Sequence, residues 1–145
     1  MDGIFAGGNK MDFSFTPDQD LLRAHIRELL GEVCPPSYAE RCDEEARPPR
    51  EAYEALAKHG WFGLVLPDEH GGSGGSAIEL AILLEEAGYH FEELAMWLFR
   101  TLTYGGYAVL QHGTSEQKAT LLPKVLRGEA KSREQSDLGF NKLCQ

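Results

Sequence analysis

Three capping boxes constrain the fold of this chain more than any other feature of its sequence. In a capping box, a serine or threonine hydroxyl and a glutamate or glutamine side chain three residues later satisfy the free N–H groups at the start of a helix. The three pairs are Thr16 with Gln19, Ser76 with Glu79, and Thr114 with Gln117. The sequence therefore predicts the starting points of three helices that are spread along its length.

Apolar residues recur at helical spacing after each of these starts and in two further segments. Helices are predicted over about 17–33, 50–59, 76–88, 92–111 and 114–128, and no segment alternates convincingly as a strand would. Amphipathic helices joined by short connections pack as an antiparallel bundle. The predicted fold class is therefore all-α, with about five helices.

The segments around these helices lead to more specific expectations. The polar, proline-rich stretch 34–49 has no helical or strand period, so we expect an irregular connection in which short helical turns are allowed. The glycine-rich stretch 64–75 is predicted to be a loop. The helix over 76–88 is apolar nearly all round, which predicts central burial. In the next helix, Gly105-Gly106 indicates a weak point or a place of close approach.

Charge and cysteine content exclude several classes of partner. A formal net charge of −9 argues against binding to nucleic acid or to anionic lipid. The most apolar stretch, 94–110, contains Arg100 and falls short of the roughly 20 apolar residues that a membrane span needs. The three cysteines lack the paired spacing of a disulfide framework or a zinc site. We therefore expect a cytoplasmic protein without a metal site.

The residues alone reveal no catalytic constellation. The glycines at 71–75 favour a plain turn over a phosphate cradle, because no lysine with a following serine or threonine comes after them. Glu85 and Glu86 are adjacent on a helix and point about 100° apart, which favours a solvated or capping role over acid–base chemistry. No histidine stands three or four residues from another histidine or a cysteine, so a local metal motif is absent.

One face of the predicted helix 92–111 carries a functional signal. Met96, Arg100 and Tyr104 stand at positions i, i+4 and i+8 and therefore share a face. This face could wall a ligand pocket. The alternative is that Met96 and Tyr104 pack in the core while Arg100 reaches solvent or pairs with an acid.

Five segments, taken in order, resemble the N-terminal helical domain of the acyl-CoA dehydrogenases. They are FTPDQ at 15–19 leading to Leu22-Arg23, LAKHGWFG at 56–63, LPDEHGG at 66–72, EEAG at 85–88, and HGTSEQK at 112–118 running on to Leu122-Pro123 and Gly128-Glu129. Each segment alone is weak, but their common order is specific. The resemblance covers about 12–129 and implies the family activity, which is FAD-dependent oxidation of an acyl-CoA thioester between its α and β carbons.

The resemblance also implies what this chain would need for that activity. Family members continue into a β domain and a second helical domain, which together hold the FAD and supply a glutamate base. The family segment that contacts the flavin reads like TEPxAGSD, and only Ser136 and Asp137 match it here. We therefore expect no bound FAD, no catalytic residue and no turnover in the isolated chain.

The resemblance gives Met96, Arg100 and Tyr104 a role as walls of the acyl-chain pocket. A cation that faces an aliphatic chain loses its hydration without gaining a partner. If this face lines a pocket, we therefore expect an acyl-CoA-like ligand whose acyl group is not a simple fatty chain.

We divide the chain into a flexible leader at 1–11, a helical domain at 12–129, and a divergent tail at 130–145 for which disorder is an open alternative. Two functions compete. The chain is either a truncated acyl-CoA dehydrogenase, inactive alone or completed as half of a split enzyme by a partner chain, or a free-standing helical binding module. For the binding module, we expect exposed apolar surface on the helices over 76–88 and 92–111 to favour self-association or a partner chain, and we predict a homo-oligomer, most simply a dimer.

Overall fold

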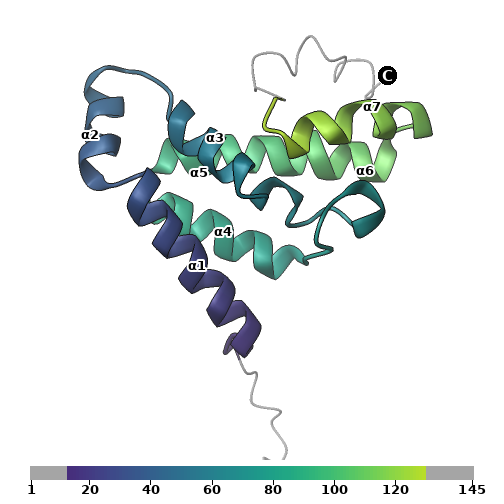
Figure 1. Cartoon of the computed structure of the whole chain (residues 1–145), viewed down its shortest axis with the longest axis horizontal. Helices are drawn as coiled ribbons and strands as arrows, with labels where there is room; N and C mark the ends of the chain where they lie inside the picture. The colour runs from purple at the N-terminus through teal and green to yellow at the C-terminus, as the bar shows by residue number, and fades with distance from the viewer. Residues whose placement is uncertain (1–12, 130–145) are drawn as a thin grey trace, which may run out of the picture.

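The computed structural model describes residues 13–129, which form helices without any strand. The elements are α1 (Pro17–Val33), α2 (Pro36–Glu44), α3 (Arg50–Lys58), η1 (Trp61–Gly63), η2 (Asp68–His70), α4 (Ala77–His90), α5 (Glu92–Phe99), η3 (Arg100–Tyr107), α6 (Ala108–His112) and α7 (Ser115–Leu126). Figure 1 shows α5 and α6 lying end to end along the long axis, with α2 near one end and α7 near the other. The all-α prediction is confirmed for the described residues.

All three predicted capping boxes are present. At α1, the Thr16 hydroxyl accepts from the Gln19 backbone N–H and the Gln19 side chain accepts from the Thr16 backbone N–H. The same reciprocal pair starts α7 at Thr114. At α4, the Glu79 carboxylate accepts from the Ser76 N–H at 2.8 Å. These local bonds let each helix begin where the sequence places it.

The core lies where α1, α3, α4 and α5 meet. Ile26 and Leu30 of α1 are fully buried, as are Leu83 of α4 and Leu94 and Leu98 of α5. A smaller apolar cluster joins Leu66, Val109 and Leu122 beneath α6 and α7. The first cluster packs α5 against α1, α3 and α4, and the second packs α6 against α7.

A buried carboxylate joins α1 to α4. Glu86 is only 2% exposed, and it accepts from the Arg27 Nε and Nη2 atoms at 2.9 and 2.7 Å and from the Arg23 Nε atom at 2.8 Å. Arg23 also pairs with the exposed Glu85. The hydrogen bonds from Arg27 and the charge of both arginines hold the pKa of Glu86 below its usual range. The solvated reading of this pair is therefore wrong for Glu86.

The stretch 34–49 is not an irregular connection, because α2 occupies Pro36–Glu44. Pro36 stands at the first helical position, where a proline costs no hydrogen bond. Tyr38 and Cys42, four residues apart, are both buried against the rest of the molecule. Pro35 is the N-cap of α2 and Pro36 is its first residue, so this proline pair begins the helix that the sequence pattern did not predict.

The prediction of central burial for the 76–88 helix is wrong on one face. Ile78 is 52% exposed and Tyr89 is 84% exposed, while Ile82 and Leu83 are buried. The main packing partners of α4 are α1 and α5, and Ile78 and Tyr89 lie outside these contacts at the surface. Apolar surface predicted for this helix is thus present.

The predicted helix over 92–111 is interrupted by a π-helix. Residues Arg100–Tyr107 form η3, with α5 before it and α6 after it. Gly105 and Gly106 are buried there, and a Cβ on Gly106 would touch Val125 of α7 and Leu66. The glycine pair is therefore a place of close approach, which was one of its two predicted meanings.

No helix among residues 13–129 has the length and apolar character required to cross a lipid bilayer.

Candidate functional site

A cavity of about 830 Å³ lies between the α2–α3 corner and one side of α5. Its lining comes from two stretches that are far apart in sequence. The residues are Cys42, Asp43, Ala46, Arg47, Pro48 and Arg50 on one side and Phe91, Glu92, Glu93, Trp97 and Arg100 on the other. The wall mixes charged groups with two large aromatic rings, so it can contact both polar and apolar parts of a ligand.

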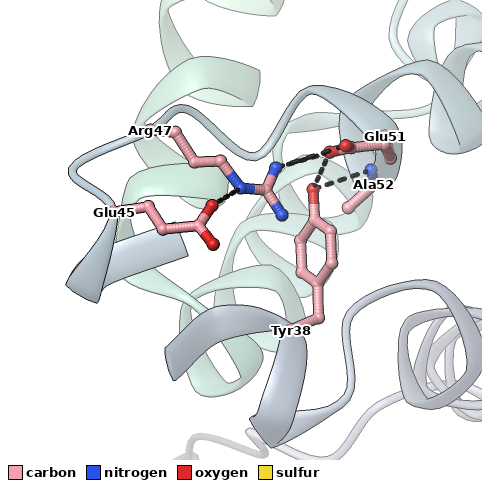
Figure 2. Close-up of polar contacts among 5 residues, drawn as sticks. All are labelled: Tyr38, Glu45, Arg47, Glu51 and Ala52. Atoms are coloured by element: carbon pink, nitrogen blue, oxygen red, sulfur yellow. Dashed lines mark hydrogen bonds and ion pairs between the residues drawn. The ribbon is translucent and has the colours of Figure 1, made fainter. Parts of the chain in front are cut away.

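A fixed polar cluster holds the α2–α3 side of this cavity in place (Figure 2). The Tyr38 hydroxyl donates to the Glu51 carboxylate at 2.6 Å, and the Arg47 Nη1 atom donates to the same carboxylate at 3.0 Å. Arg47 also donates through Nε to Glu45 at 2.8 Å and stacks over the Tyr38 ring. Arg47 is therefore already neutralised and serves as a wall of the cavity.

The charges in this cluster favour each other. The hydrogen bonds from Tyr38 and Arg47 lower the pKa of Glu51 to about 2. Burial and the bond to Glu51 raise the pKa of Tyr38, and Glu51 and Glu45 raise the pKa of Arg47. Because Tyr38 stays a neutral donor and Glu51 stays an anion, the cluster keeps its arrangement across the whole neutral range.

The α5 side is fixed by aromatic and hydroxyl contacts. The Trp97 Nε1 atom donates to Glu93 at 2.9 Å, and its ring meets the Tyr53 ring edge-on at 5.4 Å. The Tyr53 hydroxyl bonds the Thr101 hydroxyl at 2.7 Å, both groups being buried. These contacts tie α3 to α5 and η3, so the cavity has two rigid sides.

Arg100 is the half-buried arginine of the cavity that has no carboxylate partner among residues 13–129. Three arginines in the described chain are half-buried, namely Arg23, Arg47 and Arg100. The first two have carboxylate partners, whereas no carboxylate of residues 13–129 lies within ion-pair distance of Arg100. The exposed Arg50 is also unpaired at the same cavity. The cavity thus retains free guanidinium groups.

The three residues predicted to wall a pocket do not come together in this cavity. Arg100 lines it, while Met96 is half-buried outside its lining. Tyr104 is 54% exposed and packs edge-on against Phe99. The α-helical spacing assumed for this face ends at Arg100, where the π-helix begins. Hydrogen bonds in a π-helix join residues five apart, whereas those in an α-helix join residues four apart, so Tyr104 does not follow Arg100 on the same face. Ser136 and Asp137 lie outside the described residues.

Among the residues that line the cavity, sequence reasoning had named Arg100 as a pocket wall and had missed the others on both sides. Glu93, Trp97 and Arg100 stand at i, i+4 and i+7, which is the helical spacing that could have identified the α5 side. The opposite side follows α2, a helix that the sequence analysis did not predict, so its position relative to α5 was not accessible.

The glycine loop 71–75 does not offer free amides to a phosphate group. The glycine loop uses its own amides: the N–H groups of Ser73, Gly74 and Gly75 donate to the backbone carbonyls of Gly63, Leu66 and Leu64. A backbone nest needs free N–H groups to bind an anion, so the plain-turn interpretation of 71–75 is supported. Residues 13–129 also hold no group of side chains suited to a metal ion.

Comparison with known proteins adds the family. Residues 16–129 match the model of the acyl-CoA dehydrogenase N-terminal domain. The chain belongs to the acyl-CoA dehydrogenase family. This helical domain is the part of the family that the match covers, and the resemblance seen in the sequence is thereby confirmed.

Full-length relatives extend well beyond the matched part. The chain is 35% identical over 119 residues to acryloyl-CoA reductase (NADH) of Anaerotignum propionicum, covering 82% of this chain and 30% of that protein. It is 31% identical over 119 residues to the short-chain specific acyl-CoA dehydrogenase of Clostridium acetobutylicum, covering 82% and 31%. The chain therefore spans about a third of the length of these relatives.

Solved structures share the fold. A chain of the ChsE4-ChsE5 complex from Mycobacterium tuberculosis superposes with a TM-score of 0.65 at 30% identity, covering 82% of this chain and 30% of that chain. A chain from work on the electron transferring flavoprotein of Acidaminococcus fermentans gives a TM-score of 0.74 at 24% identity, covering 81% and 31%. The second likeness supports the helical fold alone.

Proposed function

We propose that residues 13–129 form the helical wall of an acyl-CoA oxidoreductase site. Met96, Arg100 and Tyr104 remain the proposed wall residues, and of these three only Arg100 lines the cavity beside α5. The family match over 16–129 carries this proposal. The cavity beside α5 supports it, because its walls are fixed by their own hydrogen bonds before any ligand binds. A preformed, partly apolar cavity is the common form of a small-molecule site.

The proposed activity requires FAD that is held by structure outside residues 13–129. That structure could come from further residues of the same protein or from a partner chain, as in a split enzyme. The glycine loop supports this division, because its amides are consumed by the fold and offer no phosphate cradle.

The visible spectrum of the purified chain tests the proposal. We expect the 145-residue chain to be colourless and to show no turnover when FAD, an acyl-CoA and an artificial electron acceptor are added. Addition of a polypeptide that contains the β domain and second helical domain of a relative should restore flavin binding and turnover. A chain that purifies yellow would contradict the division, and a complemented chain that binds flavin but no acyl-CoA would contradict the helical-wall role.

A second function, self-association as a helical interaction module, is favoured by one observation. Large apolar side chains are exposed on α4 and η3, where no other described element covers them; they are Ile78, Tyr89, Tyr104 and Tyr107. Patches of this kind favour a second copy or a partner chain. Cys34 and Cys42 are free thiols, and we propose the reducing cytoplasm as the compartment.

A further inference from the structure

We infer that Arg100 selects an acyl group that carries a negative charge at its far end, such as a second carboxylate. This inference rests on the proposed acyl-CoA function and names the class of acyl group that the cavity would accept. Three features of the cavity support it: the missing partner of Arg100, the distribution of charge along α5, and the aromatic rings in the cavity wall.

The pairing of Arg100 is unusual for this chain. The sequence contains 23 Asp and Glu against 14 Lys and Arg, so carboxylate partners are plentiful. Both other half-buried arginines among residues 13–129 use them. A half-buried guanidinium that lacks an anion has lost part of its hydration, and no ion pair compensates for that loss. An anionic ligand would supply the missing partner, and a planar carboxylate fits the guanidinium fork with two hydrogen bonds.

The acidic residues of the cavity restrict where this anion can bind. Glu92 is at the start of α5 and Arg100 follows its end, so eight residues separate them by about 12 Å along the helix axis. Glu93 is engaged by the indole N–H of Trp97. Asp43 lies on the opposite wall and forms no ion pair with Arg100. Along α5, an anion is therefore repelled from the Glu92 end and attracted to the Arg100 end. Arg50, which is exposed on the opposite wall, is a second free cation of the cavity.

The aromatic side chains of the cavity suit carbon chains. Phe91 and Trp97 both line the cavity, and Trp97 is fixed in orientation by Glu93 and Tyr53. Methylene groups would lie against these rings while a terminal carboxylate reached Arg100. An acyl group that ends in a methyl would instead leave the guanidinium desolvated and unpaired, which costs affinity.

Fluorescence of Trp97 gives a direct test, because the chain has two tryptophans and Trp97 lines the cavity. A Trp61→Phe background leaves Trp97 as the reporter. The ligands are the CoA thioesters of glutarate and of valerate, which have equally long acyl chains, and free CoA. Calorimetric titration of the unsubstituted chain gives the same comparison if the background substitution disturbs η1.

We expect the glutarate thioester to bind roughly tenfold or more tightly than the valerate thioester, as a charge-assisted pair would provide. Arg100→Gln should abolish this preference. Arg41→Gln is the matched control, because Arg41 is exposed and unpaired on α2 but outside the cavity lining, and it should keep the preference.

Equal affinity for the two thioesters, or a preference that survives Arg100→Gln, would overturn the inference while leaving the helical-wall role intact. A response to free CoA as strong as the response to the glutarate thioester would also overturn it, because the anion at Arg100 would then be a CoA phosphate. Failure of every thioester to bind, with the chain folded by circular dichroism, would count against the proposed function and remove the basis of the inference.

Discussion

Single residues in this domain show how pairing decides the fate of a charge. Glu86 is buried and satisfied by two arginines, whereas Arg100 is half-buried and unsatisfied. Removing one partner of a buried pair leaves the other charge without compensation, which costs more than the pair itself contributes. The two sites therefore respond in opposite ways to loss of charge.

We expect Glu86→Gln to lower the free energy of unfolding by about 2–3 kcal/mol, because Arg23 and Arg27 lose their shared anion at a buried position. Urea denaturation followed by circular dichroism measures this change. Glu85→Gln is the control: Glu85 is exposed, so its loss should cost about 1 kcal/mol at most. Equal losses for the two variants would show that the α1–α4 contact does not depend on Glu86.

The contact of Glu86 with Arg23 and Arg27 also determines how the stability of the chain changes with pH. The pKa of Glu86 is lowered in the folded chain, so its contribution is complete above the unfolded pKa of about 4.3 and is lost as pH falls through the folded pKa. Between about pH 5 and pH 3, the unsubstituted chain should therefore lose more stability than Glu86→Gln does.

At the scale of elements, the sequence predicted where helices begin, but it did not predict how the helices lie against one another. The capping boxes at Thr16, Ser76 and Thr114 are set by residues three apart, so sequence alone located them. The cavity depends on where α2 lies against α5, and that position follows from long-range packing of Tyr38 and Cys42. The π-helix η3 packs against α7, and no local period in the sequence reveals where the helix changes from α to π.

The glycines divide into removable and required ones, and this division predicts two opposite outcomes. Gly31→Ala in α1 meets nothing within 4 Å and should raise the free energy of unfolding by about 0.5–1 kcal/mol, because alanine favours the helix. Gly72→Ala would place a Cβ 1.9 Å from the Leu66 carbonyl oxygen. The loop could not then keep its path, so this variant should unfold at clearly lower urea concentration. Similar midpoints for the two variants would contradict the loop geometry.

At the scale of the whole molecule, residues 13–129 form a domain with two kinds of surface that could contact a ligand or another chain. One is the cavity beside α5, and the other is the exposed apolar side of α4 and η3. This chain spans about a third of the length of its relatives.

We expect the purified chain to self-associate, most simply as a dimer, through the exposed apolar side chains of α4 and η3. Light scattering across micromolar concentrations should show a mass above the monomer mass of 16.1 kDa. Tyr104→Ser with Tyr107→Ser should shift the equilibrium toward the monomer, while Glu28→Ser on the exposed side of α1 should not. A strictly monomeric profile at every concentration would contradict this expectation.

The π-helix between α5 and α6 has a consequence for how this domain can vary. A turn of π-helix holds more residues than a turn of α-helix, so each residue rotates less about the helix axis. The direction in which Val109 points therefore depends on how many residues lie between 100 and 107. A residue gained or lost there would swing α6 around its own axis without altering a single contact side chain in α5. The number of residues in η3 thus sets the rotation of α6 relative to α5. Related sequences could change this rotation by gaining or losing a residue in η3.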